Sequence, residues 1–132
     1  MLFRSNHTAE RVAGGYKVSG RWPFSSGVNV CQWVLVLLIL PVQGGAPDRI
    51  FALLKLSDCE VEDTWHVTGL AGTGSNDVIA RDLFIPDAHL LRVNDLNGGP
   101  SPGSAVNPEH IYQLPIFGVF SYNLVEIGRA HV

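Results

Sequence analysis

Apolar and polar residues alternate in short stretches along most of the chain, and turns separate these stretches. In residues 14–22 (GGYKVSGRW), Val18 falls on the opposite side from Lys17. This period of two residues is typical of a half-buried β-strand. Residues 31–40 (CQWVLVLLIL) are almost wholly apolar and form too short a run for a helix, so they predict a fully buried strand.

Three more segments predict strands. Residues 49–56 (RIFALLKL) should pair back on the apolar strand after a turn at 42–48 (VQGGAPD), where Gly44-Gly45 supplies positive φ. Residues 59–67 (CEVEDTWHV) alternate again. Residues 77–86 (DVIARDLFIP) form a further strand that ends at Pro86.

These strands follow one another from about residue 12 to residue 93, and no helical pattern interrupts them. A glycine loop at 69–77 (GLAGTGSND) joins two of them. Short strands separated by glycine and proline turns predict a mainly β fold, as a small antiparallel barrel or sandwich.

The composition changes after the last predicted strand. The next segment (NDLNGGPSPGSAVN) has the composition of a linker. Asn107 then predicts a helix N-cap and Pro108 the first helical position, and the helix should restart at Pro115. We therefore expect a β-domain at 6–93, a linker at 94–107 and the start of a truncated helical domain at 108–125.

The two ends of the chain, 1–5 and 126–132, are predicted to be artefacts. Leu2-Phe3-Arg4-Ser5 can be encoded as CTC TTC CGA TCT. The reverse complement of that DNA, read with one preceding base, encodes Glu and then Ile127-Gly128-Arg129. A sequencing adapter read through at both ends of a short metagenomic insert would produce this inverted pair, and the alternative is coincidence.

Composition indicates a piece of a larger protein. Hydrophobic residues make up 46% of the 132 residues and the mean hydropathy is +0.18, which is apolar for a soluble domain of this size. The longest apolar run, Trp33–Leu40, is much shorter than the roughly 20 residues that span a bilayer. We therefore expect a cytoplasmic protein without a membrane segment, whose missing parts cover the apolar surface.

Charge and cysteine content narrow the function further. The net charge is −3 and no basic block occurs, which argues against a nucleic-acid partner. Cys31 and Cys59 predict reduced structural thiols. Cysteine and histidine do not occur at metal-ligand spacing, so no metal site is expected.

Three motifs, in this order, carry a resemblance to a known family. Residues 14–27 (GGYKVSGRWPFSSG), 63–78 (DTWHVTGLAGTGSNDV) and 83–91 (LFIPDAHLL) resemble the middle β-domain of the acyl-CoA dehydrogenase superfamily. Within it they most resemble the oxygenase components of two-component flavin-dependent monooxygenases, which hydroxylate aromatic compounds. The resemblance covers nearly all of residues 12–125.

The resemblance implies a fragment of a larger α+β enzyme, with this β-domain between a helical N-terminal domain and a four-helix bundle that forms a homotetramer. Flavin, as FMN or FAD, lies between the β-domain and the bundle. A separate reductase supplies it in reduced form, and the enzyme uses O2 to hydroxylate a small aromatic substrate. The fragment alone should be inactive, and no catalytic residue is assigned within it.

The motif at 20–27 (GRWPFSSG) is the implied flavin contact. In the dehydrogenases, a Trp-x-Thr threonine meets flavin N5, and a tryptophan follows it by seven positions. Counting back from Trp33 gives Ser26 as the N5 contact, and Ser25 is the second choice. A serine hydroxyl can donate to oxidised N5 or accept from reduced N5–H. The implied remainder of the contact is an aromatic wall that excludes water and a glycine that lets the backbone approach the ring: Trp22, Phe24 and Gly27.

The glycine loop is a weaker candidate, through Thr73, Gly74 and Ser75. Its backbone amides could hold an anion, but a tight β-connection closed by Asn76 and Asp77 is the preferred interpretation. Ala71 also stands where the family commonly has an arginine, which weakens a phosphate contact here.

Other candidate groups receive structural interpretations. His66 and His89 could act as acid–base groups, but we expect a strand histidine and a loop histidine. We expect Trp65 to pack in the barrel rather than to bind substrate.

Two other functions stay open at this point. One is a fragment of an acyl-CoA dehydrogenase, which removes hydrogens from Cα and Cβ of an acyl thioester. The other is a non-enzymatic β-barrel binding module. The form Arg-Trp-Pro-Phe-Ser-Ser-Gly at 21–27 favours the monooxygenases over the dehydrogenases, in which Trp-Ile-Thr is typical.

Overall fold

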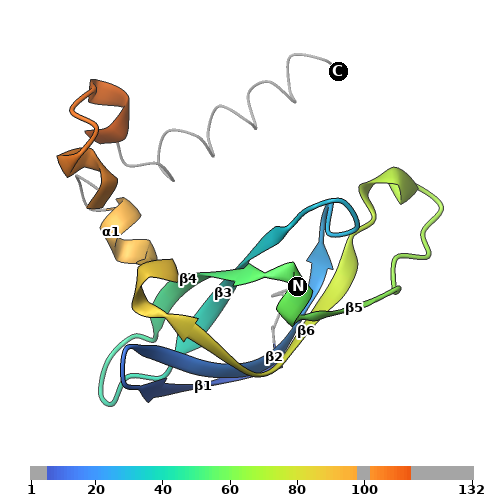
Figure 1. Ribbon diagram of the computed structural model, residues 1–132, viewed down its shortest axis with the longest axis horizontal. Coiled ribbons are helices and arrows are strands. Elements are labelled where there is room, and N and C mark those ends of the chain that lie inside the picture. The colour runs from blue at the N-terminus through green and yellow to red at the C-terminus, as the bar shows by residue number, and fades with distance from the viewer. Residues whose placement is uncertain (1–5, 98–101, 114–132) are drawn as a thin grey trace. The chain divides into compact units, whose positions relative to one another are not determined.

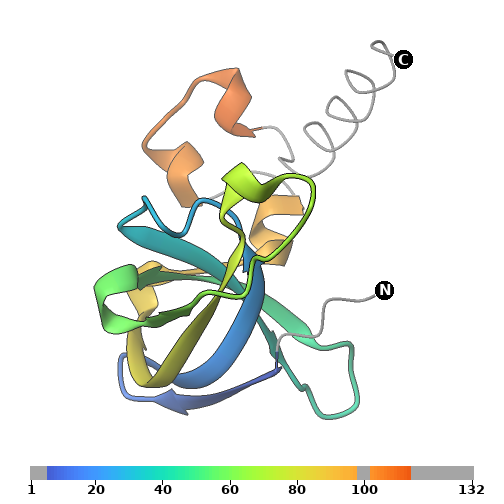
Figure 2. The same cartoon turned by 90° about the vertical axis from the view of Figure 1, so that its right-hand side faces the viewer.

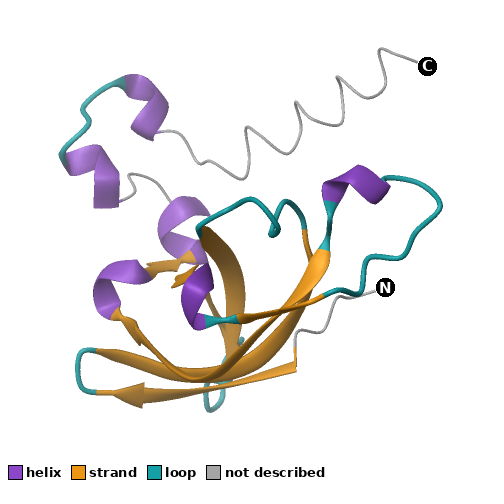
Figure 3. Cartoon of the chain, turned by 45° about the vertical axis from the view of Figure 1, so that its right-hand side comes forward, coloured by secondary structure: helices purple, strands orange, loops and turns teal. Residues whose placement is uncertain are grey.

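The computed structural model describes residues 6–97 and 102–113, and the chain divides into two compact units between Leu90 and Leu91. Strands dominate the first unit, with short helical turns between them (Figure 3). The expected mainly β, antiparallel architecture is confirmed, and it takes the form of two sheets (Figure 1).

The first sheet has the strand order β1-β2-β6-β5 and is antiparallel throughout. Its strands are β1 (Asn6–Val12), β2 (Gly15–Ser25), β6 (Asn76–Pro86) and β5 (Glu60–Glu62). The second sheet has the order β3-β4-β7, with β3 at Trp33–Leu40, β4 at Asp48–Lys55 and β7 at Leu90–Arg92. The hairpin of β3 and β4 pairs without interruption from Trp33 opposite Lys55 to Leu40 opposite Asp48. At its turn, Gly44 has the expected positive φ of 73°.

The core lies between the two sheets, which face each other (Figure 2). Alternate residues point inward along β3 and β4, as the pleat requires, whereas register shifts in the pairing of β2 with β6 interrupt the alternation in the first sheet. The first sheet contributes Val18, Trp22, Ala80 and Ile85, and the second contributes Val36, Leu38, Ile50, Ala52 and Leu54.

The apolar strand β3 is not fully buried, contrary to the expectation for residues 31–40. Val36 and Leu38 are 3% and 0% exposed, whereas Leu35 and Ile39 are 60% and 40% exposed. The described residues therefore bury one face of β3 and leave its other face apolar and open. The strand also begins at Trp33 rather than at Cys31.

The strand expected at residues 59–67 is wrong beyond Glu62. Only Glu60–Glu62 pairs with β6. The backbone N–H groups of Thr64 and Trp65 instead donate to Oδ1 of Asn76, each at 3.0 Å. A side-chain acceptor thus replaces the ladder for these two donors, which an alternating pattern does not reveal.

Short helical turns complete the described chain. In the first unit these are η1 (Leu56–Asp58), η2 (Ala71–Thr73) and η3 (Asp87–His89). In the second unit, α1 (Val93–Asn97) and η4 (Pro102–Ala105) lie almost wholly within the segment expected to be a linker. The expectation that a helix begins at Pro108 after an Asn107 N-cap is wrong, because both residues are non-helical and only a short 3₁₀ turn, η5 (His110–Gln113), begins at His110. The restart at Pro115 and the proposed artefacts at 1–5 and 126–132 lie outside the described residues.

Two leucines of β3 test this burial pattern. Leu38→Ala should lower the free energy of unfolding by about 2–5 kcal/mol, because it leaves a cavity in the core. Leu35→Ala, on the open face, should change it by about 0.5 kcal/mol or less. Urea unfolding of both variants and of the unsubstituted 132-residue chain measures the difference in the free energy of unfolding. Similar losses for the two would mean that the chain covers both faces of β3.

Candidate functional site

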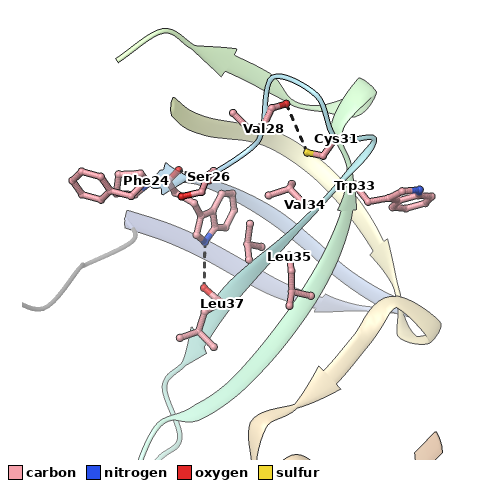
Figure 4. Close-up of a pocket in the computed structure, with 12 residues that line it drawn as sticks. Phe24, Ser26, Val28, Cys31, Trp33, Val34, Leu35 and Leu37 are labelled. Atoms are coloured by element: carbon pink, nitrogen blue, oxygen red, sulfur yellow. Dashed lines mark hydrogen bonds between the residues drawn. The ribbon is translucent and has the colours of Figure 1, made fainter. Parts of the chain in front are cut away.

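A groove of about 500 Å³ lies between the end of β2 and the strand β3 (Figure 4). Phe24 and Ser26 lie at one end of it and Trp33 at the other. Most of its lining residues are apolar, and Ser25 and Ser26 contribute hydroxyl groups. The lining residues come from 22–26 (WPFSS), from Val28 and Cys31 in the turn, and from 33–37 (WVLVL).

A β-bulge forms the aromatic end of the groove. Trp22 pairs with Val78 and Ser25 pairs with Asn76, so β2 has one extra residue between these pairs. Pro23 lies inside the bulge, where its missing N–H interrupts no ladder bond. Phe24 takes a φ of 63°, which is strained for a bulky side chain.

The two aromatic residues of the motif take different positions. Trp22 is 5% exposed, and its Nε1–H donates to the carbonyl oxygen of Leu37 at 3.2 Å. Phe24 is 53% exposed, and its ring meets the ring of Trp65 edge-on at 5.9 Å. Trp22 therefore forms part of the groove floor, and Phe24 forms an open aromatic edge.

The two serines are not equivalent. The Ser25 hydroxyl donates to the Trp22 carbonyl oxygen at 3.3 Å. The exposed Ser26 has its Oγ 2.8 Å from the Oγ of Ser75. Ser26 is thus the serine whose hydroxyl reaches the glycine loop, while the Ser25 hydroxyl turns back on its own strand.

The glycine loop packs against this corner through both backbone and side chains. The Gly27 N–H donates to the Thr73 carbonyl oxygen at 2.8 Å. Thr73 Oγ1 lies 2.7 Å from Ser75 Oγ and donates to the Leu70 carbonyl oxygen at 2.9 Å. Two motifs that lie 49 positions apart in the chain therefore form one hydroxyl-lined structure.

The loop's own hydrogen bonds favour the tight-connection interpretation. The N–H groups of Thr73, Gly74 and Asn76 donate to carbonyl oxygens within the loop, at 3.0, 3.2 and 2.8 Å. Amides that are already paired do not form an open cradle for an anion. The Asn76 amide also donates to Asn29 at 3.1 Å, which ties the loop to the turn after Ser26.

Charged groups lie beside the groove end of β6 rather than in the groove. Asp77 is 8% exposed and accepts from Arg21 Nε at 2.6 Å and from Thr64 Oγ1 at 2.9 Å. The hydrogen bond between Arg21 and Asp77, together with the charge of Glu62, raises the pKa of Arg21. The carboxylate thus has a structural role, linking β2 to the segment after β5.

The histidines and cysteines lie apart from the hydroxyl groups of Ser26, Ser75 and Thr73. The His89 ring meets Trp33 edge-on at 5.5 Å, and His66 is exposed outside the groove lining. Both cysteines are free thiols, and burial raises the pKa of Cys59. Cys31 lines the groove and donates to the Val28 carbonyl oxygen at 3.7 Å, a position that the sequence did not signal. The described part of the chain contains no group of three metal-binding side chains.

Sequence reasoning missed the lining residues of the turn and of β3, namely Val28, Cys31 and the segment 34–37. The signal was present in the unbroken apolar character of β3, because a strand with two apolar faces must cover something on each side.

Among the described helices, none is long and apolar enough to cross a membrane.

Comparisons with known proteins identify relatives of the chain. No family model matches the chain. It is 41% identical over 110 residues to the FADH(2)-dependent resorcinol hydroxylase, oxygenase component, of a Rhizobium species, covering 82% of this chain and 27% of that protein. It is 36% identical over 104 residues to the oxygenase subunit HsaA of a flavin-dependent monooxygenase from Mycobacterium tuberculosis, covering 79% and 26%.

Solved structures give the same relationship. The 3-HSA hydroxylase from Rhodococcus sp. RHA1 superposes with a TM-score of 0.76 at 31% identity, over 86% of this chain and 29% of that one. XiaF from a Streptomyces species, solved with FADH2 and glycerol, superposes with a TM-score of 0.61 at 30% identity, over 74% and 26%.

The chain spans about a quarter of the length of the curated relatives that it matches. Over that span, the sequence identity and the fold agree. The chain belongs to the family of oxygenase components of flavin-dependent monooxygenases, within the acyl-CoA dehydrogenase fold.

Proposed function

We propose that the parent protein of this chain uses reduced flavin and O2 to hydroxylate a small aromatic compound. The observation that carries the proposal is the groove, which combines aromatic and aliphatic walls with the Ser26 hydroxyl at its rim. Flat apolar ligands bind in grooves of this kind, where a few polar groups fix their orientation. The hydroxylases among the chain's relatives support the same conclusion.

The residues of the groove fit a flavin ring. Trp22 and Phe24 would contact its apolar faces, and Ser26 would form a hydrogen bond with N5. Ser26 is preferred to Ser25, because Ser26 is exposed and its hydroxyl reaches the glycine loop, whereas the Ser25 hydroxyl turns back on its own strand. Gly27, with a φ of 74°, would let the backbone turn close to the ring.

The proposed chemistry divides between cofactor and protein. Bound reduced flavin supplies the electrons that activate O2. The apolar walls of the groove would exclude water once other segments of the parent close over it, which would limit unproductive release of hydrogen peroxide. The Ser26 hydroxyl would hold the proton on N5.

FAD is the proposed form of the flavin, in preference to FMN. The resorcinol hydroxylase is named for FADH2, and XiaF was solved with it. A separate reductase would supply the reduced cofactor.

The apolar outer face of β3 supports a larger parent in which other segments cover this domain. Trp33, Leu35 and Ile39 are 43%, 60% and 40% exposed in the described structure. A homotetramer built on a helical bundle, in the cytoplasm, is the arrangement that the family resemblance implies.

Purified parent enzyme tests the proposal directly. Supplied with an unrelated flavin reductase, NADH and O2, it should convert a phenolic compound to its hydroxylated product. Desaturation of an acyl thioester instead would identify a dehydrogenase. If neither reaction occurs and flavin does not bind, the chain is a binding module and the proposal fails.

In the parent enzyme, Ser26→Ala should uncouple O2 consumption from hydroxylation, because the hydrogen bond that holds the N5 proton is lost. A neutral hydrogen bond contributes about 0.5–1.5 kcal/mol, so the ratio of hydrogen peroxide to product should rise roughly twofold to tenfold. Reduced-flavin affinity should fall less, since the ring contacts remain. Peroxide and product assays give the ratio.

Ser25→Ala is the matched comparison for Ser26→Ala. Its hydroxyl bonds to its own strand, so the ratio of peroxide to product should change little. An effect of Ser25→Ala alone would place the flavin contact one residue earlier. No effect of either variant would make both serines structural.

The 132-residue chain alone should bind flavin weakly. A formed small-molecule site buries about 70–90% of its ligand, and the open groove lacks the segments that would close over the ring. Titration of flavin fluorescence should give a dissociation constant far above that of the parent. Tight one-to-one binding would show that the β-domain is sufficient.

A further inference from the structure

Three hydroxyl groups form a continuous chain behind the groove. Ser26 Oγ lies 2.8 Å from Ser75 Oγ, and Ser75 Oγ lies 2.7 Å from Thr73 Oγ1. Ser26 is exposed at the groove, whereas Ser75 is only 4% exposed. Ser75, in the middle of this chain of hydroxyl groups, is therefore shielded from water, and its hydroxyl proton must find an acceptor within the protein.

The direction of these hydrogen bonds follows from counting protons. Each hydroxyl has one proton to donate. Thr73 donates its proton to the Leu70 carbonyl oxygen at 2.9 Å, so Ser75 must donate to Thr73. Ser26 must then donate to Ser75, and its remaining lone pairs face outward. In this arrangement Ser26 can only accept a hydrogen bond from a ligand.

The opposite direction is also feasible but has one hydrogen bond fewer. Thr73 would release Leu70 and donate to Ser75, Ser75 would donate to Ser26, and Ser26 would donate outward. The Leu70 carbonyl oxygen would keep two other donors, Trp65 Nε1–H and the Thr73 N–H, both at 3.0 Å. The reversal therefore leaves Leu70 satisfied and sacrifices the single bond from Thr73.

We infer that Thr73 and Ser75 orient the Ser26 hydroxyl as an acceptor and so make the site select reduced flavin over oxidised flavin. Reduced flavin carries a proton on N5 and donates to Ser26 without disturbing the chain. Oxidised N5 can only accept, so its binding requires the reversal. The inference rests on the proposed contact between Ser26 and N5. Ser75 and Thr73 are positioning residues, because they act through Ser26.

The selectivity should correspond to about one neutral hydrogen bond, or roughly twofold to tenfold in relative affinity. It should also raise the midpoint potential of the bound flavin, by about 30 mV for a tenfold preference in a two-electron couple. A site that binds the reduced form more tightly would accept flavin from a reductase and release it after oxidation.

Thr73→Val gives the sharpest test in the full-length parent enzyme. Without Thr73 Oγ1, the buried Ser75 proton has Ser26 as its remaining acceptor, and the Ser26 proton turns outward. Reduced flavin should then bind more weakly and oxidised flavin more tightly. The ratio of the affinity for reduced flavin to that for oxidised flavin should therefore fall by at least roughly threefold. Thr73→Ser keeps the hydroxyl and should keep the ratio. Ser57→Ala, which removes an exposed hydroxyl bonded to Asp58, is the remote control.

Ser75→Ala is the second variant. Ser26 then loses its inward acceptor and can either donate or accept. Oxidised flavin should bind more tightly, and the affinity for reduced flavin should stay the same. A gain in affinity for one redox state is an effect that general damage to the loop does not produce.

The measurements are dissociation constants for oxidised FAD and, under anaerobic conditions, for FADH2, together with the midpoint potential of the bound flavin. If Thr73→Val and Ser75→Ala weaken both redox states equally, or leave the ratio unchanged, while Ser26→Ala weakens FADH2 binding, the inference is overturned and the proposed contact stands. If Ser26→Ala also leaves FADH2 binding unchanged, the contact itself fails. A lower ratio in Thr73→Val that Thr73→Ser restores supports the inference.

Discussion

The Trp22 indole joins the two sheets where the groove begins. Its ring is 5% exposed in the core, its Nε1–H donates to Leu37 of β3, and the ring of His7 stacks on its face at 5.9 Å. A buried donor left without an acceptor costs about 1–3 kcal/mol, so this bond, together with the Ile39 N–H that donates to His7 Nε2 at 2.9 Å, favours the observed position of β3 against the first sheet. The bulge, the two serines and the glycine loop all follow from where Trp22 ends the regular part of β2.

Strain at Phe24 and the contacts of the glycine loop belong together. A phenylalanine with a φ of 63° is held there by its surroundings, because the backbone conformation itself is unfavourable. The edge contact with Trp65 and the Gly27–Thr73 backbone bond lie on either side of it. Trp65 in turn donates to Leu70, the carbonyl at the end of the hydroxyl chain. The aromatic edge and the hydroxyl chain are therefore parts of one structure.

The sequence predicts most of the sheets and only part of the site. Alternation, apolar runs and glycine turns located β2, β3, β4 and β6, since each contributes buried residues to the core between the sheets. The loop after Glu62 was not predictable, because Asn76 supplies the acceptor for Thr64 and Trp65 from 11 or 12 positions away. Ser26 followed from a family spacing. Its contact with Ser75 has no local pattern, because two serines 49 positions apart meet only through the packing of two turns.

The exposed apolar face of β3 suits a domain that belongs to a larger protein. Both faces of β3 carry apolar side chains, and exposing either face to water is unfavourable. The described chain covers only the face of Val36 and Leu38. The groove runs along the same strand, from Trp33 to Leu37. If the proposed function holds, segments of the parent that cover the outer face of β3 would also border the groove, so covering the apolar surface and completing the proposed flavin site would go together.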